Sequence, residues 1–182
     1  MTSVLVAYAS RHGATQEIAE RVADTLRAAG LEASARPVRD AGDLAGYDAF
    51  VVGSAVYMFH WLKDATRFVR ANRAILAGRP LWLFSSGPLG TETTDAKGRD
   101  VLEVSQAKEV AALVDTLHAR GHEVFFGAWS SGKPVGLGER FVAVMPAARA
   151  ALPEGDFRDW PLIDAWSDGI AEELRGGSVE PG

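Results

Sequence analysis

The chain has 182 residues, of which 47% are hydrophobic and 24% charged, and this composition suits one globular domain with a substantial core. Its net charge of −5 argues against nucleic acid as the main partner. Because the sequence contains no cysteine, disulfides, iron–sulfur clusters and thiolate chemistry are excluded, and any redox reaction must use a bound organic cofactor.

Short apolar runs alternate along the chain with segments of helical periodicity. The runs predict strands at residues 4–9, 32–38, 49–54, 81–85 and 123–129. Apolar residues repeating every three or four positions predict helices from residue 14 to Gly30, from about 62 to Gly78, from 100 to 120 and from about 159 to 175. Strands that alternate with helices indicate a parallel sheet covered on both faces, within one domain over residues 1–175.

Two segments fall outside this alternation. Residues 130–155 have no clean period and are rich in Gly, Pro and Ala, so we expect an insertion after the fifth strand. Residues 176–182 are predicted to be a flexible tail. The first residues lack a basic segment before an apolar one, and no apolar stretch approaches the ~18 residues that cross a bilayer. A cytoplasmic protein is expected, with peripheral contact at the inner face of the membrane left open.

The turn Ser10-Arg11-His12-Gly13-Ala14-Thr15 joins the first strand to the first helix. Its hydroxyls, backbone N–H groups and helix N-terminus favour an anion such as phosphate. It matches neither G-x-G-x-x-G nor G-x-x-x-x-G-K-[ST], and an ordinary turn capped by Ser and Thr stays an alternative.

Two further strand ends suit the same ligand. Tyr57, Phe59 and Trp61 follow the third strand, and aromatic side chains there favour stacking on a flat heteroaromatic ring. The fourth strand runs into Ser85-Ser86-Gly87, a small polar turn able to approach ring carbonyls and N–H groups. Since ligands of such sheets bind beyond the carboxyl ends of the strands, the three loops together predict a site for a phosphate tethered to a flat ring.

The motifs YASRHGATxxIA, GSAVY and SSGPLG resemble the flavodoxin-like superfamily. More narrowly, with His60 and the late GDFRDW, they are similar to flavodoxin-domain proteins related to menaquinone-dependent protoporphyrinogen IX dehydrogenase. The resemblance implies a flavodoxin-like α/β three-layer sandwich with a five-stranded parallel sheet in the order 2-1-3-4-5. It also implies FMN as the cofactor, with the phosphate at Ser10, Arg11, His12, Gly13, Ala14 and Thr15. One side of the ring would be lined by Ser54, Ala55, Val56, Tyr57, Met58 and Phe59, and its pyrimidine edge by Ser86, Gly87, Pro88 and Leu89.

By this resemblance the chain is an FMN-dependent oxidoreductase with a quinone or tetrapyrrole substrate, and no catalytic residue is assigned. One alternative is a flavodoxin that shuttles electrons between partner proteins. Another is a non-catalytic domain without cofactor, because Phe59 stands where relatives often have Gly and would narrow access to the flavin. The 130–155 insertion is predicted to overhang the flavin and contact a substrate or membrane, with packing on the fifth strand or dimerisation as alternatives.

No metal site is predicted. His118 and His122 are four residues apart, but Gly121 lies between them near a predicted helix end, so we interpret them as a solvated helix terminus. No G-x-S-x-G motif is present, which argues against a hydrolase.

Overall fold

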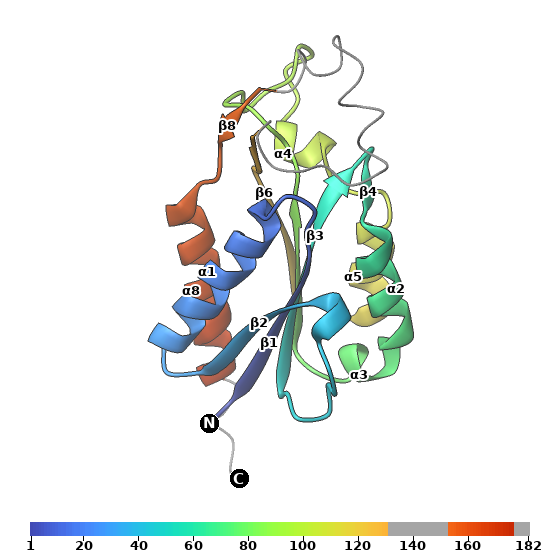
Figure 1. The fold of residues 1–182 in the computed structure, drawn as a ribbon, viewed down its shortest axis with the longest axis vertical. Helices are drawn as coiled ribbons and strands as arrows, with labels where there is room; N and C mark the ends of the chain where they lie inside the picture. The colour runs from blue at the N-terminus through green and yellow to red at the C-terminus, as the bar shows by residue number, and fades with distance from the viewer. Residues whose placement is uncertain (131–152, 177–182) are drawn as a thin grey trace.

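A parallel sheet forms the middle layer of the computed structural model, which describes residues 1–130 and 153–176 (Figure 1). Its strands are β1 (Ser3–Ala9), β2 (Glu32–Pro37), β3 (Ala49–Tyr57), β5 (Leu81–Ser86) and β6 (Gly121–Phe125), in the order β2-β1-β3-β5-β6. A sixth strand, β4 (His60–Trp61), pairs antiparallel with the end of β3 and lies off this path. The order of the five parallel strands confirms the predicted flavodoxin-like topology.

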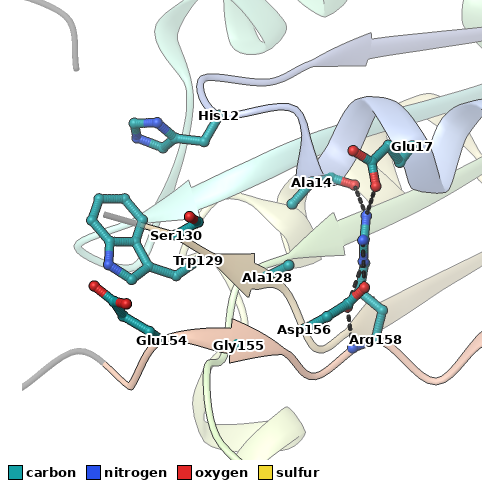
Figure 2. Close-up of a pocket in the computed structure, with 10 residues that line it drawn as sticks. All are labelled: His12, Ala14, Glu17, Ala128, Trp129, Ser130, Glu154, Gly155, Asp156 and Arg158. Carbon is teal, nitrogen blue, oxygen red and sulfur yellow. Dashed lines mark hydrogen bonds and ion pairs between the residues drawn. The ribbon is translucent and has the colours of Figure 1, made fainter. Parts of the chain in front are cut away.

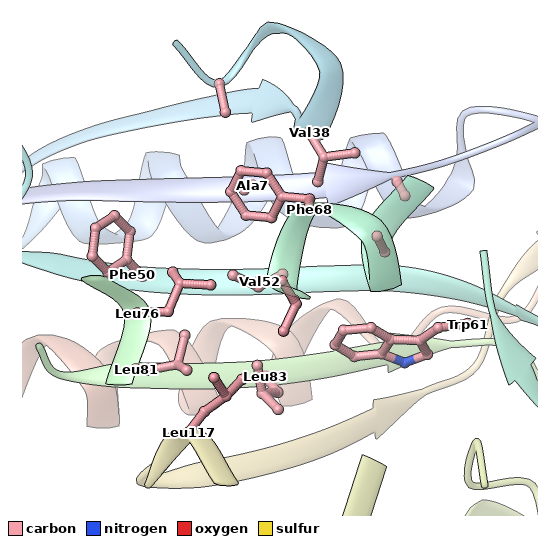
Figure 3. Packing of buried hydrophobic residues seen from close by; sticks show 14 of the residues in the cluster. Ala7, Val38, Phe50, Val52, Trp61, Phe68, Leu76, Leu81, Leu83 and Leu117 are labelled. Carbon is pink, nitrogen blue, oxygen red and sulfur yellow. The ribbon is translucent and has the colours of Figure 1, made fainter. Parts of the chain in front are cut away.

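Helices cover both faces of the sheet (Figure 1). Alternate residues of each strand point to opposite faces, so Val4 and Val6 pack under α1 (Ala14–Ala28) and α8 (Trp160–Gly176). Leu5 and Ala7 point to the other face, under η1 (Val38–Asp40), α2 (Lys63–Ala71), α3 (Arg73–Ala77) and α5 (Val110–Leu117). Figure 3 shows this second cluster, in which Phe50, Leu76 and Leu117 are almost completely buried.

Two predicted helices are interrupted. The helix predicted from residue 62 to Gly78 is divided at Asn72, whose φ of −110° separates α2 from α3. The helix predicted over 100–120 is divided into α4 (Val101–Val104) and α5, because the backbone N–H of Lys108 donates to the carbonyl of Phe59 instead of continuing the helix.

The predicted fifth strand is also two elements. β6 ends at Phe125, and β7 (Ala128–Trp129) pairs antiparallel with β8 (Gly155–Asp156) in a separate two-stranded sheet. Most of the predicted 130–155 insertion (residues 131–152) and most of the predicted tail (177–182) lie outside the described residues. Within the described ranges, no helix is both long and apolar enough to cross a membrane.

Candidate functional site

The three loops singled out in the sequence meet at one edge of the sheet. Ala9 at the end of β1 lies opposite Ser54 in β3, and Ala55 in β3 lies opposite Ser86 at the end of β5. Because the three strands are parallel, the loops that follow them leave the sheet side by side. The edge therefore brings the candidate phosphate loop next to the two candidate ring-binding loops.

The loop after β1 has the backbone of an anion site. Gly13, just before α1, has φ 92° and ψ −15°, a left-handed conformation that costs other residues about 1–2 kcal/mol. Its N–H donates to Ser10 Oγ at 3.0 Å, which fixes the turn. Thr15, in the first turn of α1, is only 2% exposed. The first N–H groups of α1 have no intrahelical acceptor and carry the positive end of the helix dipole, so they suit phosphate.

The segment predicted as a loop after β3 is a tight hairpin. β3 continues past Ser54 to Tyr57, and the chain turns at Met58 (φ 50°) and Phe59 (φ 62°) into β4. Both side chains at the turn are exposed, Met58 by 88% and Phe59 by 54%. The Tyr57 ring lies 4.8 Å from the Arg11 guanidinium, so the hairpin contacts the phosphate loop through a cation–π interaction.

Glu109, which directly precedes α5, anchors this hairpin. Its carboxylate accepts the backbone N–H of Trp61 at 2.7 Å and lies 3.0 Å from His60 Nδ1. The neighbouring Lys108 N–H donates to the carbonyl of Phe59 at 2.9 Å. The hairpin is thus fixed at its turn and along β4 by a segment almost 50 residues later in the chain.

Two buried serines at this edge, Ser54 and Ser85, form hydrogen bonds to other groups of the protein. Ser54 Oγ accepts the N–H of Leu62 at 3.0 Å and donates to the carbonyl of Ala55 at 2.9 Å. Ser85 Oγ accepts the indole N–H of Trp61 at 2.8 Å and lies 2.9 Å from His122 Nε2. The Ser85 hydroxyl therefore joins the Trp61 indole and the His122 imidazole in one chain of hydrogen bonds.

His122 corrects part of the sequence interpretation. It lies on β6 rather than at a solvated helix end, and burial lowers its pKa from 6.5 to about 4. His118 does terminate α5, where it is exposed in a left-handed conformation. The sequence misplaced His122 because Gly121 begins a strand that pairs with Trp82 of β5. This pairing joins residues far apart in the chain and has no local signal in the sequence.

The loop after β5 is packed closely against the hairpin strand. A Cβ on Gly87 would lie 3.1 Å from Val56 Cβ, and the Gly87 N–H donates to the carbonyl of Phe125 at 3.2 Å. The N–H of Gly127 donates in turn to the carbonyl of Pro88 at 2.8 Å. Glycine at position 87 therefore permits the approach of two predicted ring-binding segments.

A cavity of about 420 Å³ adjoins the candidate phosphate loop (Figure 2). It is bounded by the loop and first turn of α1, by β7, and by the segment containing β8, through His12, Ala14, Glu17, Ala128, Trp129, Ser130, Glu154, Gly155, Asp156 and Arg158. The rings of His12 and Trp129 meet edge to face at 4.9 Å. Of these residues, only those of the phosphate loop were predicted as site residues, because the pairing of β7 with β8 has no signature in the sequence.

Arg158 connects this region to α1. Its side chain is only 6% exposed and pairs with Asp156 through two nitrogens, at 2.7 and 2.6 Å. Its third nitrogen lies 2.7 Å from the Glu17 carboxylate and 3.3 Å from the carbonyl of Ala14. The hydrogen bonds from Arg158 lower the pKa of Asp156, so this carboxylate stays ionised at neutral pH.

Comparison with known proteins decides the family, because a family model described as flavodoxin domain matches residues 5–131. The chain belongs to the flavodoxin-domain family. No curated protein matches the sequence significantly.

Solved structures similar to this flavodoxin domain share its fold. An archaeal flavodoxin is 14% identical with a TM-score of 0.60, and the match covers 96% of this chain and 99% of that one. A point mutant of a flavodoxin from Pseudomonas aeruginosa is 20% identical with a TM-score of 0.56, and the match covers 96% of this chain and 99% of that one. Rubredoxin oxygen:oxidoreductase from Desulfovibrio gigas is 13% identical with a TM-score of 0.62, and the match covers 99% of this chain and 38% of that one.

Family and fold together indicate FMN and confirm the cofactor predicted from the sequence. The residues present fit FMN. Gly13 adopts the left-handed conformation directly before α1, which leaves the first N–H groups of that helix available to a phosphate. The Tyr57 hairpin and the Gly87 loop follow the neighbouring strand ends, where the ring would lie. The assignment of individual residues to parts of the cofactor stays a prediction.

Proposed function

We propose that this flavodoxin domain is an FMN-dependent oxidoreductase. The observation that carries the proposal is the convergence of the Gly13 turn, the Tyr57 hairpin and the Gly87 loop at the carboxyl ends of β1, β3 and β5. When bound, FMN would supply one- and two-electron redox chemistry, and the protein would bind it and orient it.

Each loop has a distinct role in this proposal. The phosphate would be held by backbone N–H groups and hydroxyls of residues 10–15, with Gly13 giving the loop its shape. Residues 54–59 would border one side of the ring, and residues 86–89 would contact its polar edge through backbone groups. Arg11 lies over Tyr57, so it would also hold the phosphate loop and the ring wall in one fixed arrangement.

The finer proposal concerns the substrate, a quinone or tetrapyrrole. Met58 and Phe59 form an exposed apolar turn at the rim of the candidate site, although most large apolar side chains among the described residues are buried. Such a turn suits a large, flat, hydrophobic substrate better than a small polar one. The similarity of the motifs to protoporphyrinogen-linked flavodoxin domains supports the same substrate class.

An anaerobic assay with the FMN-loaded protein tests this proposal. We expect reduced protein to be reoxidised by a soluble quinone, or oxidised protein to be reduced by protoporphyrinogen, with saturation kinetics in either case. The variant Met58→Ser/Phe59→Ser should raise KM for the hydrophobic substrate. Because these residues also border the proposed ring site, KM is compared with both proteins saturated with FMN. Absence of turnover with both classes would refute the finer proposal.

An electron shuttle is the second candidate. It is supported by the flavodoxins from an archaeon and from P. aeruginosa, which match over 99% of their own lengths. A shuttle would be reduced by a flavodoxin or ferredoxin reductase and show no turnover with a small substrate. A protein that takes up no flavin under any condition would instead favour a non-catalytic domain.

A further inference from the structure

We propose that Arg158 is a positioning residue that makes the site selective for the phosphorylated flavin, FMN, over riboflavin. It would act by pairing with two carboxylates beside the proposed phosphate loop and offsetting one of their two charges, rather than by contacting the phosphate. The inference rests on the proposed FMN site and goes beyond it, because it concerns a residue from the opposite end of the chain.

The Arg158 guanidinium lies beside the first turn of α1. It lies 3.3 Å from the carbonyl of Ala14 and 2.7 Å from the carboxylate of Glu17, both in the first turn of α1 (Figure 2). This turn supplies the N–H groups that suit an anion. Arg158 is therefore a full positive charge next to the proposed phosphate site.

All three guanidinium nitrogens of Arg158 already bind groups of the protein. Nε and one terminal nitrogen bind Asp156, the other terminal nitrogen binds Glu17 and Ala14, and the guanidinium carbon lies 4.5 Å from the centre of the Trp160 ring. Because the Arg158 side chain is only 6% exposed, its guanidinium does not face the solvent from which a ligand would approach. Its effect on a phosphate would therefore come from its charge and from the position in which it fixes α1.

Two carboxylates and one guanidinium set the charge beside the proposed phosphate site. Glu17 and Asp156 would repel an FMN phosphate, which carries about −1.5 to −2 charges at neutral pH. Arg158 offsets one of these carboxylate charges and fixes both side chains. Riboflavin has the same ring and ribityl chain without the phosphate, so its affinity should not depend on these three charges.

The experiment compares FMN and riboflavin dissociation constants, measured by quenching of flavin fluorescence in low and high salt. For Arg158→Gln we expect the FMN constant to rise about tenfold and the riboflavin constant to change less than about twofold, with the FMN effect reduced in about 1 M salt. Glu17→Gln in the same chain should restore much of the FMN affinity, because it removes the negative charge that Arg158 pairs with in the native protein.

Arg21→Gln is the matched control. Arg21 also joins α1 to α8, through two hydrogen bonds of 2.6 Å to Asp164, but it lies one turn further from the helix N-terminus. Loss of this pair should change stability without changing the ratio of FMN to riboflavin affinity. If Arg158→Gln does not fold, Glu17→Gln alone decides the question, because it should tighten FMN binding and leave riboflavin binding unchanged.

Each outcome has one meaning. An unchanged FMN-to-riboflavin ratio in Arg158→Gln, or in Glu17→Gln where the first variant does not fold, overturns the role of Arg158 and leaves the proposed function intact. An equal change for both flavins shows a purely structural role and also overturns it. Failure of the unmodified protein to bind FMN refutes the proposed function itself.

Discussion

The buried His122 makes the stability of this protein depend on pH. In the native state its Nε2 is hydrogen-bonded to Ser85 Oγ at 2.9 Å, and burial lowers its pKa from 6.5 to about 4. In the unfolded chain it has its ordinary pKa of about 6.5. As the pH falls below 6.5, His122 binds a proton in the unfolded state but not in the native state. The free energy of unfolding therefore decreases until the pH reaches the native pKa.

The size of this loss of unfolding free energy follows from the pKa shift of His122. One pKa unit corresponds to about 1.4 kcal/mol, so this histidine should remove about 3 kcal/mol of unfolding free energy between pH 7 and pH 4. His122→Gln keeps an acceptor near Ser85 and cannot titrate. At pH 7 the variant should be less stable than the native protein, and this difference should shrink or reverse as the pH falls to 4.

Urea unfolding followed by tryptophan fluorescence at several pH values measures the effect. His118→Gln is the matched control, because it removes a histidine that is exposed at the end of α5 and lies outside the buried contact with Ser85. Parallel stability curves for the native protein and His122→Gln would refute the reasoning, as would a His122 resonance titrating near pH 6.5.

Three further predictions concern the hairpin and its support. Phe59→Gly should raise the melting temperature by about 2–4 °C in a thermal scan, because Phe59 is exposed and its φ of 62° costs about 1 kcal/mol; a lower melting temperature would contradict this. Glu109→Gln should lower unfolding free energy by about 1–2 kcal/mol and speed amide exchange at Trp61, whereas Glu103→Gln, at an exposed site, should do neither. Ser85→Ala should cost about 1–3 kcal/mol in urea unfolding, since it leaves the buried Trp61 indole N–H without its acceptor; a loss below about 0.5 kcal/mol would show that this bond is not needed.

The elements with a strong local period were predictable. Residues 4–9 and 81–85 are unbroken apolar runs, and they form central strands buried on both faces. The repeat of Ile18, Val22 and Leu26 sets the buried face of α1. The convergence of three loops also followed from the sequence, since alternation of strands and helices places the carboxyl ends of the parallel strands at one edge.

The parts that were not predicted depend on contacts distant in the chain. The Met58–Phe59 turn lacks the Asn-Gly or Asp-Gly pair that usually signals a hairpin, and its support comes from Lys108 and Glu109. The same contacts interrupt the helix predicted over 100–120. Arg158 was missed as a site residue for a similar reason, because only the folded chain brings it to the first turn of α1.

Uptake of FMN by the purified protein tests the central claim most directly. The protein is incubated with excess FMN and desalted, and its absorption spectrum is compared with that of Gly13→Val, in which a β-branched residue must adopt a φ of 92°. The account predicts that the native protein retains stoichiometric flavin and that Gly13→Val loses it while remaining folded. A native protein that retains no flavin, or a folded Gly13→Val that retains it equally well, would contradict the account.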